Sequence, residues 1–339
     1  MTTLELTPSI TLPSVVGLTF RPARVEDLPA LHELELTTLR VGERERVEAV
    51  EDLRTQFDDP WSNPETDSLA GFTAEGRLVA FARSFIPPQP EREVVAHLWL
   101  EIHPDYRAPE LIATVFDWLE GRATERLHAS HADLPRSLRT GTPDHVAWYI
   151  ALFETRGYRP IRYFYRMRRD LSEPIPAAPL PPGFAFSRHT PELDHAMHHV
   201  FNESFRDHWG YQPVSYEEWG QFFTKRGSFR PDLSLLILDQ TQGEPKAAGI
   251  SYNVVDIAEN AWAGIKQGWI GELGVLRAYR KRGLATALLA ESMRRFKAEG
   301  LDHATLGVDS ENPTGALGIY EHVGFKVVKR MQAMEKAVL

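Results

Sequence analysis

Residues 273–289 have the types and spacing that could bind an anion. They read Leu-Gly-Val-Leu-Arg-Ala-Tyr-Arg-Lys-Arg-Gly-Leu-Ala-Thr-Ala-Leu-Leu, which predicts an apolar strand turning directly into a helix. The small residues Gly283 and Ala285 would let backbone N–H groups point outward at the helix N-terminus, where the helix dipole also favours a pyrophosphate. Cationic Arg280, Lys281 and Arg282 lie in the same turn. A glycine that only tightens a turn gives the same local pattern, so the downstream sequence has to decide.

Two further motifs follow this turn. Residues 304–308 predict a buried strand, which leads to Asn312 and Pro313, a short helix and Tyr-Glu-His-Val-Gly-Phe at 320–325. In this order and spacing the three parts resemble the GNAT acetyltransferase superfamily, whose signature is Gln/Arg-x-x-Gly-x-Gly/Ala, a strand, an Asn and Tyr-Glu-x-x-Gly-Phe. The resemblance implies an N-acetyltransferase of EC class 2.3.1 that takes acetyl-CoA as co-substrate and needs no metal.

Composition limits the classes of function. The 339 residues are enough for two domains, and the hydrophobic (42%) and charged (25%) fractions are those of a soluble globular protein. The net charge of -9 disfavours a nucleic-acid partner and slightly favours cationic acceptors such as amines. The absence of Cys excludes disulfides, thiolate zinc sites and cysteine nucleophiles.

No segment reads as a targeting or membrane signal. Residues 1–17 lack a basic start with a continuous apolar run, and nothing approaches the roughly 18 apolar residues of a membrane span. We therefore expect a cytoplasmic protein with no membrane partner, as a monomer or homodimer.

The chain reads as two copies of one fold. The proline-rich segment at 171–182 is incompatible with a helix or a central strand, and it predicts a stiff linker. The closing motif at 320–325 has a counterpart in Phe-Glu-Thr-Arg-Gly-Tyr at 153–158, and the openings around Phe20 and Phe186 also match. We predict domains at 18–170 and 183–339.

Alternating strands and helices in each copy predict an α/β fold with a mixed, mostly antiparallel sheet flanked by helices on both faces. In the second half the predicted strands are 184–188, 233–239, 247–255, 267–275, 304–308 and 327–334, and the predicted helices are 193–205, 216–224, 285–299 and 314–323.

The two copies differ in chemistry. When Tyr106-Arg107 is aligned with Tyr279-Arg280, Glu110 takes the glycine position and Ile112 the small position. A carboxylate would repel a pyrophosphate, and Ile would block its approach to the backbone. Phe153 stands where the closing motif of the second copy has Tyr320. We therefore expect a structural first copy and one acetyl-CoA site per chain, an organisation similar to that of tandem GNAT acetyltransferases.

By resemblance, the backbone of 273–275 lies along the pantetheine, the amides of 280–286 cradle the pyrophosphate, and the Val275 N–H is the oxyanion donor. The residues assigned in this way to coenzyme A are Leu273, Gly274, Val275, Arg280, Lys281, Arg282, Gly283, Leu284, Ala285, Thr286, Asn312 and Tyr320.

Three side chains are catalytic candidates, each with a structural alternative. Tyr320 is the family's general acid for the thiolate, or an aromatic that anchors the last helix. Glu272 is a general base acting through water, or a solvated strand charge; alternation with Leu273 leaves open which face it occupies. Asn312 contacts the pantetheine or a catalytic water, or caps the helix after it.

The acceptor is expected beside the end of the first helix of the second copy, where aromatic and polar residues combine. The same residues would also suit a packed helix end. The candidates are Glu203, Phe205, Asp207, His208 and Trp209.

His195 and His199 have a metal-compatible i, i+4 spacing, with His198 beside them, but we interpret all three as surface histidines. The leading function is acetyl transfer to the primary amine of a small molecule by direct attack on the thioester, and two other functions stay open. One is a catalytically idle acyl-CoA sensor or scaffold, and the other is a protein or peptide N-acetyltransferase.

Overall fold

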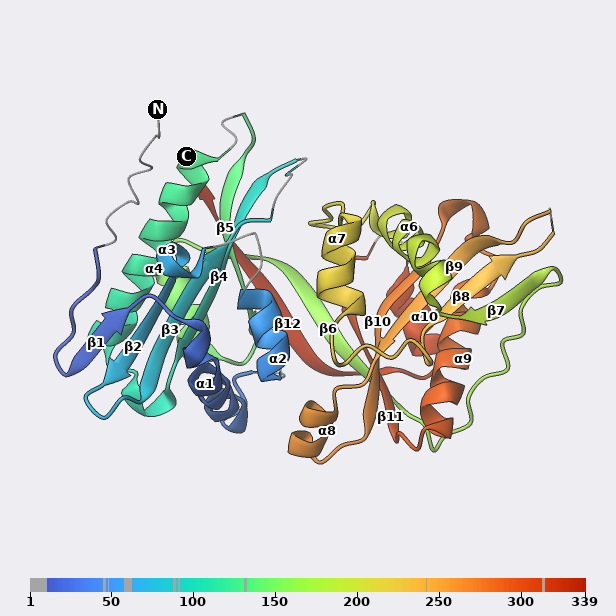
Figure 1. Ribbon diagram of the computed structural model, residues 1–339, viewed down its shortest axis with the longest axis horizontal. Coiled ribbons are helices and arrows are strands. Elements are labelled where there is room, and N and C mark those ends of the chain that lie inside the picture. The colour runs from blue at the N-terminus through green and yellow to red at the C-terminus, as the bar shows by residue number, and fades with distance from the viewer. Residues whose placement is uncertain are drawn as a thin grey trace. The chain divides into compact units, whose positions relative to one another are not determined.

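The computed structural model describes residues 11–44, 47, 49–57, 63–87, 90, 92–130, 133–241, 243–312 and 315–339. The chain divides into two compact units, Met1–Arg159 with Met334–Leu339, and Pro160–Ala333 (Figure 1). These units differ from the predicted domains because strand β6 (Arg159–Asp170) belongs to the second unit and the end of the last strand to the first. Segment 171–182 contains no helix or strand.

The first unit orders its strands β1-β2-β3-β4-β5-β12. Pairing is antiparallel from β1 to β4 and parallel between β4 and β5. Apolar residues of α1 and α2 pack on one face of the sheet, and those of α4 and α5 pack in a second core cluster. The elements are β1 (Leu18–Arg21), α1 (Leu28–Arg40), α2 (Val50–Phe57), α3 (Pro64–Asp67), β2 (Ser68–Thr73), β3 (Leu78–Phe85), β4 (Val94–Ile102), α4 (Pro109–Ala129), β5 (Arg136–Pro143), α5 (Ala147–Thr155) and the end of β12 (Lys326–Val338).

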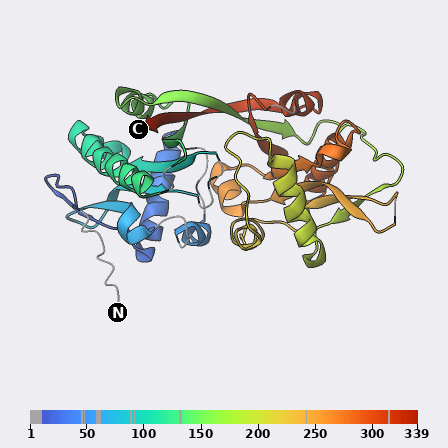
Figure 2. The ribbon, with the colours of Figure 1, turned by 90° about the horizontal axis from the view of Figure 1, so that it is seen from above.

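The second unit repeats this order as β7-β8-β9-β10-β11-β6. Only β10 and β11 pair in parallel; the other described pairs are antiparallel. Helices cover both faces, with α6 and α7 packed in one core cluster and α9 and α10 in others (Figures 1 and 2). The elements are β7 (Phe184–Arg188), α6 (Asp194–Phe205), α7 (Tyr216–Trp219), β8 (Leu235–Asp239), β9 (Lys246–Val254), α8 (Ile257–Ala263), β10 (Gln267–Val275), α9 (Leu284–Ala298), β11 (His303–Asp309) and α10 (Ala316–His322).

The predicted fold class is thus confirmed, and most predicted elements lie within a few residues of the observed ones. Helix α8 was missed. Its N-cap is Asp256, which accepts the Glu259 N–H (2.9 Å), and its C-cap is the left-handed Gly264. The helix is too short to show helical periodicity in the sequence. The helix predicted at 216–224 is α7 followed by a π-turn, Gly220–Thr224. Thr314, the predicted start of the last helix, lies outside the described residues.

The parallel strand pair of the second unit separates, and this separation positions the site. β10 and β11 pair only over Gln267–Ile270 and 303–306, although β10 continues to Val275 and β11 to Asp309. Between Ile270 and Glu272 the register against β9 shifts, a β-bulge that bends β10. A gap in the sheet therefore opens beside residues 272–275.

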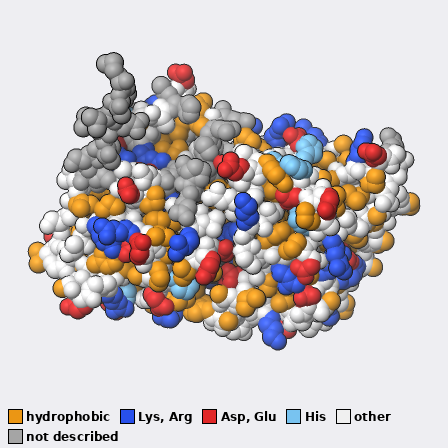
Figure 3. Space-filling view, viewed as in Figure 1, with side chains coloured by type: hydrophobic (Ala, Val, Ile, Leu, Met, Phe, Trp, Pro, Cys, Tyr) orange, Lys and Arg blue, Asp and Glu red, His pale blue; other side chains and the backbone are white. Residues whose placement is uncertain are grey.

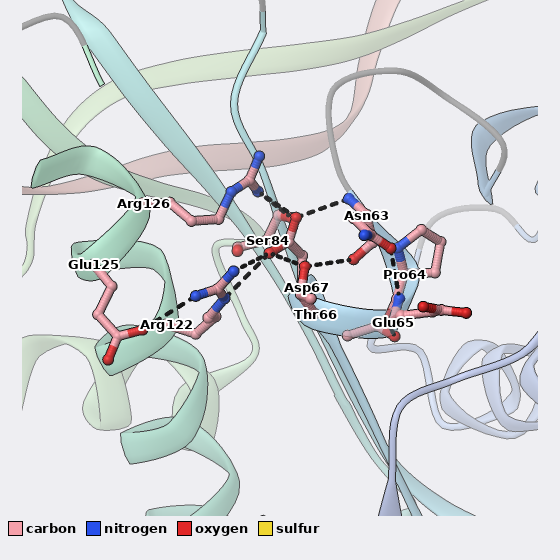
Figure 4. Close-up of polar contacts among 10 residues, drawn as sticks. Asn63, Pro64, Glu65, Thr66, Asp67, Ser84, Arg122, Glu125 and Arg126 are labelled. Atoms are coloured by element: carbon pink, nitrogen blue, oxygen red, sulfur yellow. Dashed lines mark hydrogen bonds and ion pairs between the residues drawn. The ribbon is translucent and has the colours of Figure 1, made fainter. Parts of the chain in front are cut away.

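A buried carboxylate ties α4 to the start of β2 in the first unit (Figure 4). Asp67 pairs with Arg122 and Arg126, both at 3.2 Å, and accepts the Asn63 N–H at 2.8 Å. Every ionic group of this cluster has a partner, as a buried charge requires. We interpret the cluster as structural.

Acidic and basic side chains are interspersed on the face drawn in Figure 3. Within the described ranges, no helix is long and apolar enough to cross a membrane. The cytoplasmic location stays a prediction.

Candidate active site

The turn before α9 presents a run of backbone donors. Gly283, the N-cap, is left-handed (φ 78°), and Lys281 is left-handed as well (φ 63°). The first helical bond runs from the Ala287 N–H to the Gly283 carbonyl (3.0 Å), and the amides of residues 281–286 have no acceptor within the described part of the chain. Successive unpaired amides at a helix N-terminus form an anion site. The Arg280 amide, also predicted to take part, donates instead to Arg277 (3.3 Å).

The Arg280 side chain fastens this turn to its surroundings. Its guanidinium donates to the Val275 carbonyl and to the Ser204 carbonyl at the end of α6, each at 3.2 Å. Asp207 pairs with Arg280 (3.7 Å) and accepts a hydrogen bond from Arg277. The carboxylate of Asp207, which the sequence analysis assigned to the acceptor, therefore binds the arginines of the turn.

The end of β10 directs backbone groups into the gap. The Leu276 N–H donates to the Ala248 carbonyl of β9 (3.0 Å). Because successive residues of an antiparallel strand point their amides to opposite edges, the Val275 N–H faces the side from which β11 has separated. This is the orientation that an oxyanion donor needs.

The two faces of β10 are distinct. Leu273 and Val275 pack with Leu284 and Leu288 of α9, whereas Gly274 lies against Ser204 of α6. Alternation therefore places Glu272 on the α6 face. This resolves the question that the sequence left open.

Burial shifts the pKa values of Glu272 and Tyr320. Glu272 is half-buried, and burial raises the pKa of its carboxyl group to about 8. Tyr320 is buried beside Phe325 (ring centroids 6.2 Å apart); burial, and then the charge of Glu272, raises the pKa of its phenol above the usual value. A phenol that holds its proton near a carboxyl that titrates near neutral pH suits an acid and a base, respectively.

The predicted acceptor residues at the end of α6 have different environments. Phe205 packs between Phe201 and His208, with centroids 5.0 and 4.5 Å away. Burial lowers the pKa of His208, which favours the neutral imidazole. Trp209 lies against Phe164 of β6 (5.9 Å).

Glu203 pairs with the exposed Arg206 (3.0 Å). His195 and His199 are exposed as predicted, but His198 is half-buried, lies 2.6 Å from the Val214 carbonyl and contacts Asn202. Its interpretation as a surface histidine was wrong.

Asn312 lies in the loop after β11. Its N–H donates to the Asp309 carbonyl (3.1 Å), and its own carbonyl accepts the Gly315 N–H (3.2 Å). The N-cap of α10 is Gly315, so the alternative of Asn312 as the helix cap does not hold.

Sequence reasoning missed the contribution of β6. Arg162 binds Asp309 through both carboxylate oxygens (2.8 to 3.0 Å) and lies over the Trp209 ring. Arg166, four residues on and on the same face, pairs with Glu259 of α8 (3.3 Å). The alternating arginines are visible in the sequence, but their role requires knowing that β6 pairs with β11.

The comparisons agree with this geometry. Residues 195–325 match the model of the acetyltransferase (GNAT) family. The mycothiol acetyltransferase of Thermobispora bispora is 29% identical over 272 residues, 76% of this chain and 77% of that protein. The mycothiol acetyltransferase of Salinispora tropica is 27% identical over 270 residues, 77% and 78% of the two chains.

Two solved structures show the same fold along the chain. A GCN5-related N-acetyltransferase from Sphaerobacter thermophilus has a TM-score of 0.72 at 24% identity, covering 96% of this chain and 97% of its own. A tandem GNAT protein from the clavulanic acid biosynthesis pathway has a TM-score of 0.68 at 16% identity, covering 94% and 98%.

Residues 195–325 thus match an acetyltransferase (GNAT) domain, of a family that uses acetyl-CoA as co-substrate. The chain as a whole shares the fold of a tandem GNAT protein.

Proposed function

We propose that the second unit transfers the acetyl group of acetyl-CoA to the primary amine of a small molecule. The observation that carries this proposal is the run of unpaired amides at 281–286, which lies beside a gap in the sheet. These amides suit a pyrophosphate, and the gap leaves the backbone of 273–275 free to lie along the pantetheine.

The residues around the gap suit the groups that the transfer needs. Glu272, through a water, takes one proton of the ammonium, and the amine nitrogen forms a bond to the thioester carbon. The Val275 N–H stabilises the oxyanion; the carbon–sulfur bond then breaks as Tyr320 protonates the departing thiolate. The nitrogen loses its second proton to solvent, and the Tyr320 phenol regains a proton from solvent. Asn312 lies in the loop after β11, where it would contact the pantetheine.

The names of the relatives support a small acceptor. They are mycothiol acetyltransferases, and this chain spans more than three quarters of the length of the two reported. A sensor without activity would need neither Glu272 nor Tyr320, so the presence of both favours an enzyme. A protein or peptide acceptor is the alternative that an acceptor screen would reveal.

Calorimetric titration with acetyl-CoA tests the donor site. We expect a stoichiometry near one and a loss of affinity of about 100-fold or more in Gly283→Glu, because a carboxylate would repel the pyrophosphate. Gly300→Glu is the matched control: both glycines are left-handed, and an added Cβ would meet nothing within 4 Å at either one. Equal losses in both variants, or two sites of similar affinity, would contradict the proposal.

A thiol-release assay across primary amines and peptides then tests the acceptor class. We expect small amines to be acetylated in preference to peptides. Release of thiol only with peptides would support the protein N-acetyltransferase instead.

A further inference from the structure

The central strands of the second unit carry two exposed glycines where β10 and β11 separate. The last paired residues are Ile270 and Leu306, so Gly271 and Gly307 follow directly on the two strands. Both glycines are exposed, although residues in the middle of a covered sheet are normally buried. An added Cβ at Gly307 would meet no atom within 4 Å.

This open space is on the α6 face. Gly307 pairs with Arg166 of β6, whose side chain lies over the Trp269 ring (4.3 Å). Alternation along β11 puts Gly307 on the same face as Thr305, the partner of Trp269 in β10. Glu272, the candidate base, is on the α6 face of β10 as well.

One wall of the space is rigid. The Trp269 indole donates to Glu259 (3.2 Å), and the same carboxylate accepts from Gln267 and pairs with Arg166, both at 3.3 Å. Glu259 and Gln267 are buried. A tryptophan held by a hydrogen bond on its edge and a guanidinium on its face has little freedom to swing into the space above Gly307.

The first unit shows the same parting of strands, with different residues after it. There the last paired residues are His97 and Arg139, and the next two, Leu98 and Thr140, are buried. Leu98 packs in the cluster of α4 and α5, and Thr140 bonds to the Tyr149 hydroxyl of that cluster (2.8 Å). These two side chains are therefore on the face that corresponds to α9 and α10, and the exposed glycine of β5 is Gly141.

We propose that the hollow above Gly307, with the fixed Trp269 as its wall, holds the body of the acceptor amine and sets the largest amine that the enzyme accepts. This rests on the proposed function. Glycine at 307 then leaves room for a substrate group; Gly307 is not among the left-handed glycines, so its backbone does not require it.

The test compares Gly307→Ala, Gly307→Thr and Gly307→Val with the wild type on four amines of rising size: methylamine, isopropylamine, cyclohexylamine and glucosamine. For the bulkiest amine accepted, kcat/KM should fall progressively with side-chain size, by about 10-fold to 100-fold in Gly307→Val. The value for methylamine should change less than about threefold, and the Kd for acetyl-CoA should stay constant. Gly227→Val, at another exposed glycine with open space around it, is the control.

Equal losses for large and small amines would overturn the hollow as a size filter while leaving the proposed acetyl transfer intact. A wild type that acetylates none of the four amines would overturn the proposed function and the hollow together. Thermal unfolding of each variant identifies a folding defect, and Gly307→Ala, with its single added carbon, keeps the size series interpretable if Gly307→Val unfolds.

Discussion

The two units have the same strand order and the same parting of a parallel pair, but they differ at the positions that we propose for proton transfer. In both, the closing turn carries a left-handed glycine, Gly157 or Gly324. In the first unit the N–H of Tyr158, which follows the glycine, donates to the Phe153 carbonyl (3.0 Å). In the second unit the N–H of Phe325 donates in the same way to the Tyr320 carbonyl (3.0 Å). The backbone of the motif is thus the same in both units, and at this motif position only the second unit has a phenol.

The strand facing the gap shows the same division. When Tyr106-Arg107 is aligned with Tyr279-Arg280, Trp99 of β4 takes the position that Glu272 has in β10. Trp99 contacts the Arg44 guanidinium (5.6 Å), which also pairs with Glu35 and Glu101. Side chains fill this region of the first unit, so the comparison teaches that the fold persists without the site.

The helix turn differs in length as well as in residues. Helix α4 begins two residues after Arg107, whereas α9 begins four residues after Arg280. Glu110 is therefore in the first turn of α4, level with Ala285 rather than with Gly283 as the sequence alignment had it. The shorter turn leaves fewer amides to present, a second reason why the first unit does not suit a pyrophosphate.

The largest effect that could break this comparison is expected from Tyr320→Phe, which gives the second unit the residue of the first. Phenylalanine keeps the ring packing and removes only the O–H, so turnover should fall by roughly 10²–10⁴-fold with little change in folding or acetyl-CoA affinity. Single-turnover measurement of thiol release at saturating substrates checks this. The reciprocal Phe153→Tyr should leave turnover unchanged, and a gain there would show that the first unit is active.

The next effect concerns the pH dependence that Glu272 confers. A base works in its ionised form, so kcat/KM should rise as pH increases toward about 8 and level off above it. Glu272→Gln should remove that rise and lower the plateau by roughly 10²-fold or more. A profile from pH 6 to 9.5 that keeps its rise in Glu272→Gln would assign the ionisation to another group, such as the amine.

The same carboxyl group also links stability to pH. Because its pKa is higher in the folded state than the usual 4.5, the unfolded chain loses the proton first as pH rises. The free energy of unfolding should therefore fall between pH 4.5 and about 8 by an amount that Glu272→Gln removes. Chemical denaturation at several pH values measures it, and equal slopes in both proteins would show that the carboxyl is not protonated in the folded state.

Local patterns made the second unit predictable. The bounds of β7 and β10 follow from period-two alternation, and the turn at 280–286 from its small and cationic residues. What could not be predicted depends on long-range pairing: that β6 completes the second sheet, that Asp207 pairs with Arg277 and Arg280, and that Gly271 and Gly307 follow the last paired residues of β10 and β11. None of these contacts joins residues close in sequence, so no periodicity reports them.

The smallest expected effect sharpens the comparison by separating structure from function in a feature that both units share. Arg107 donates to the Ile102 carbonyl (3.2 Å) and pairs with Glu43, as Arg280 donates to Val275 and pairs with Asp207. Since the first unit retains this arrangement without a pyrophosphate turn, we interpret it as a strut between the strand end and the helix turn.

Lysine cannot reproduce the forked geometry of arginine, so Arg107→Lys and Arg280→Lys should each lower the free energy of unfolding, by about 1 to 3 kcal/mol. Only Arg280→Lys should also weaken acetyl-CoA binding, and by less than about 10-fold, because lysine keeps the charge. Denaturant titration and calorimetry on both variants measure the two effects. If Arg280→Lys lost affinity without losing stability, its guanidinium would be a ligand for the coenzyme rather than a strut, and the two units would differ at this position too.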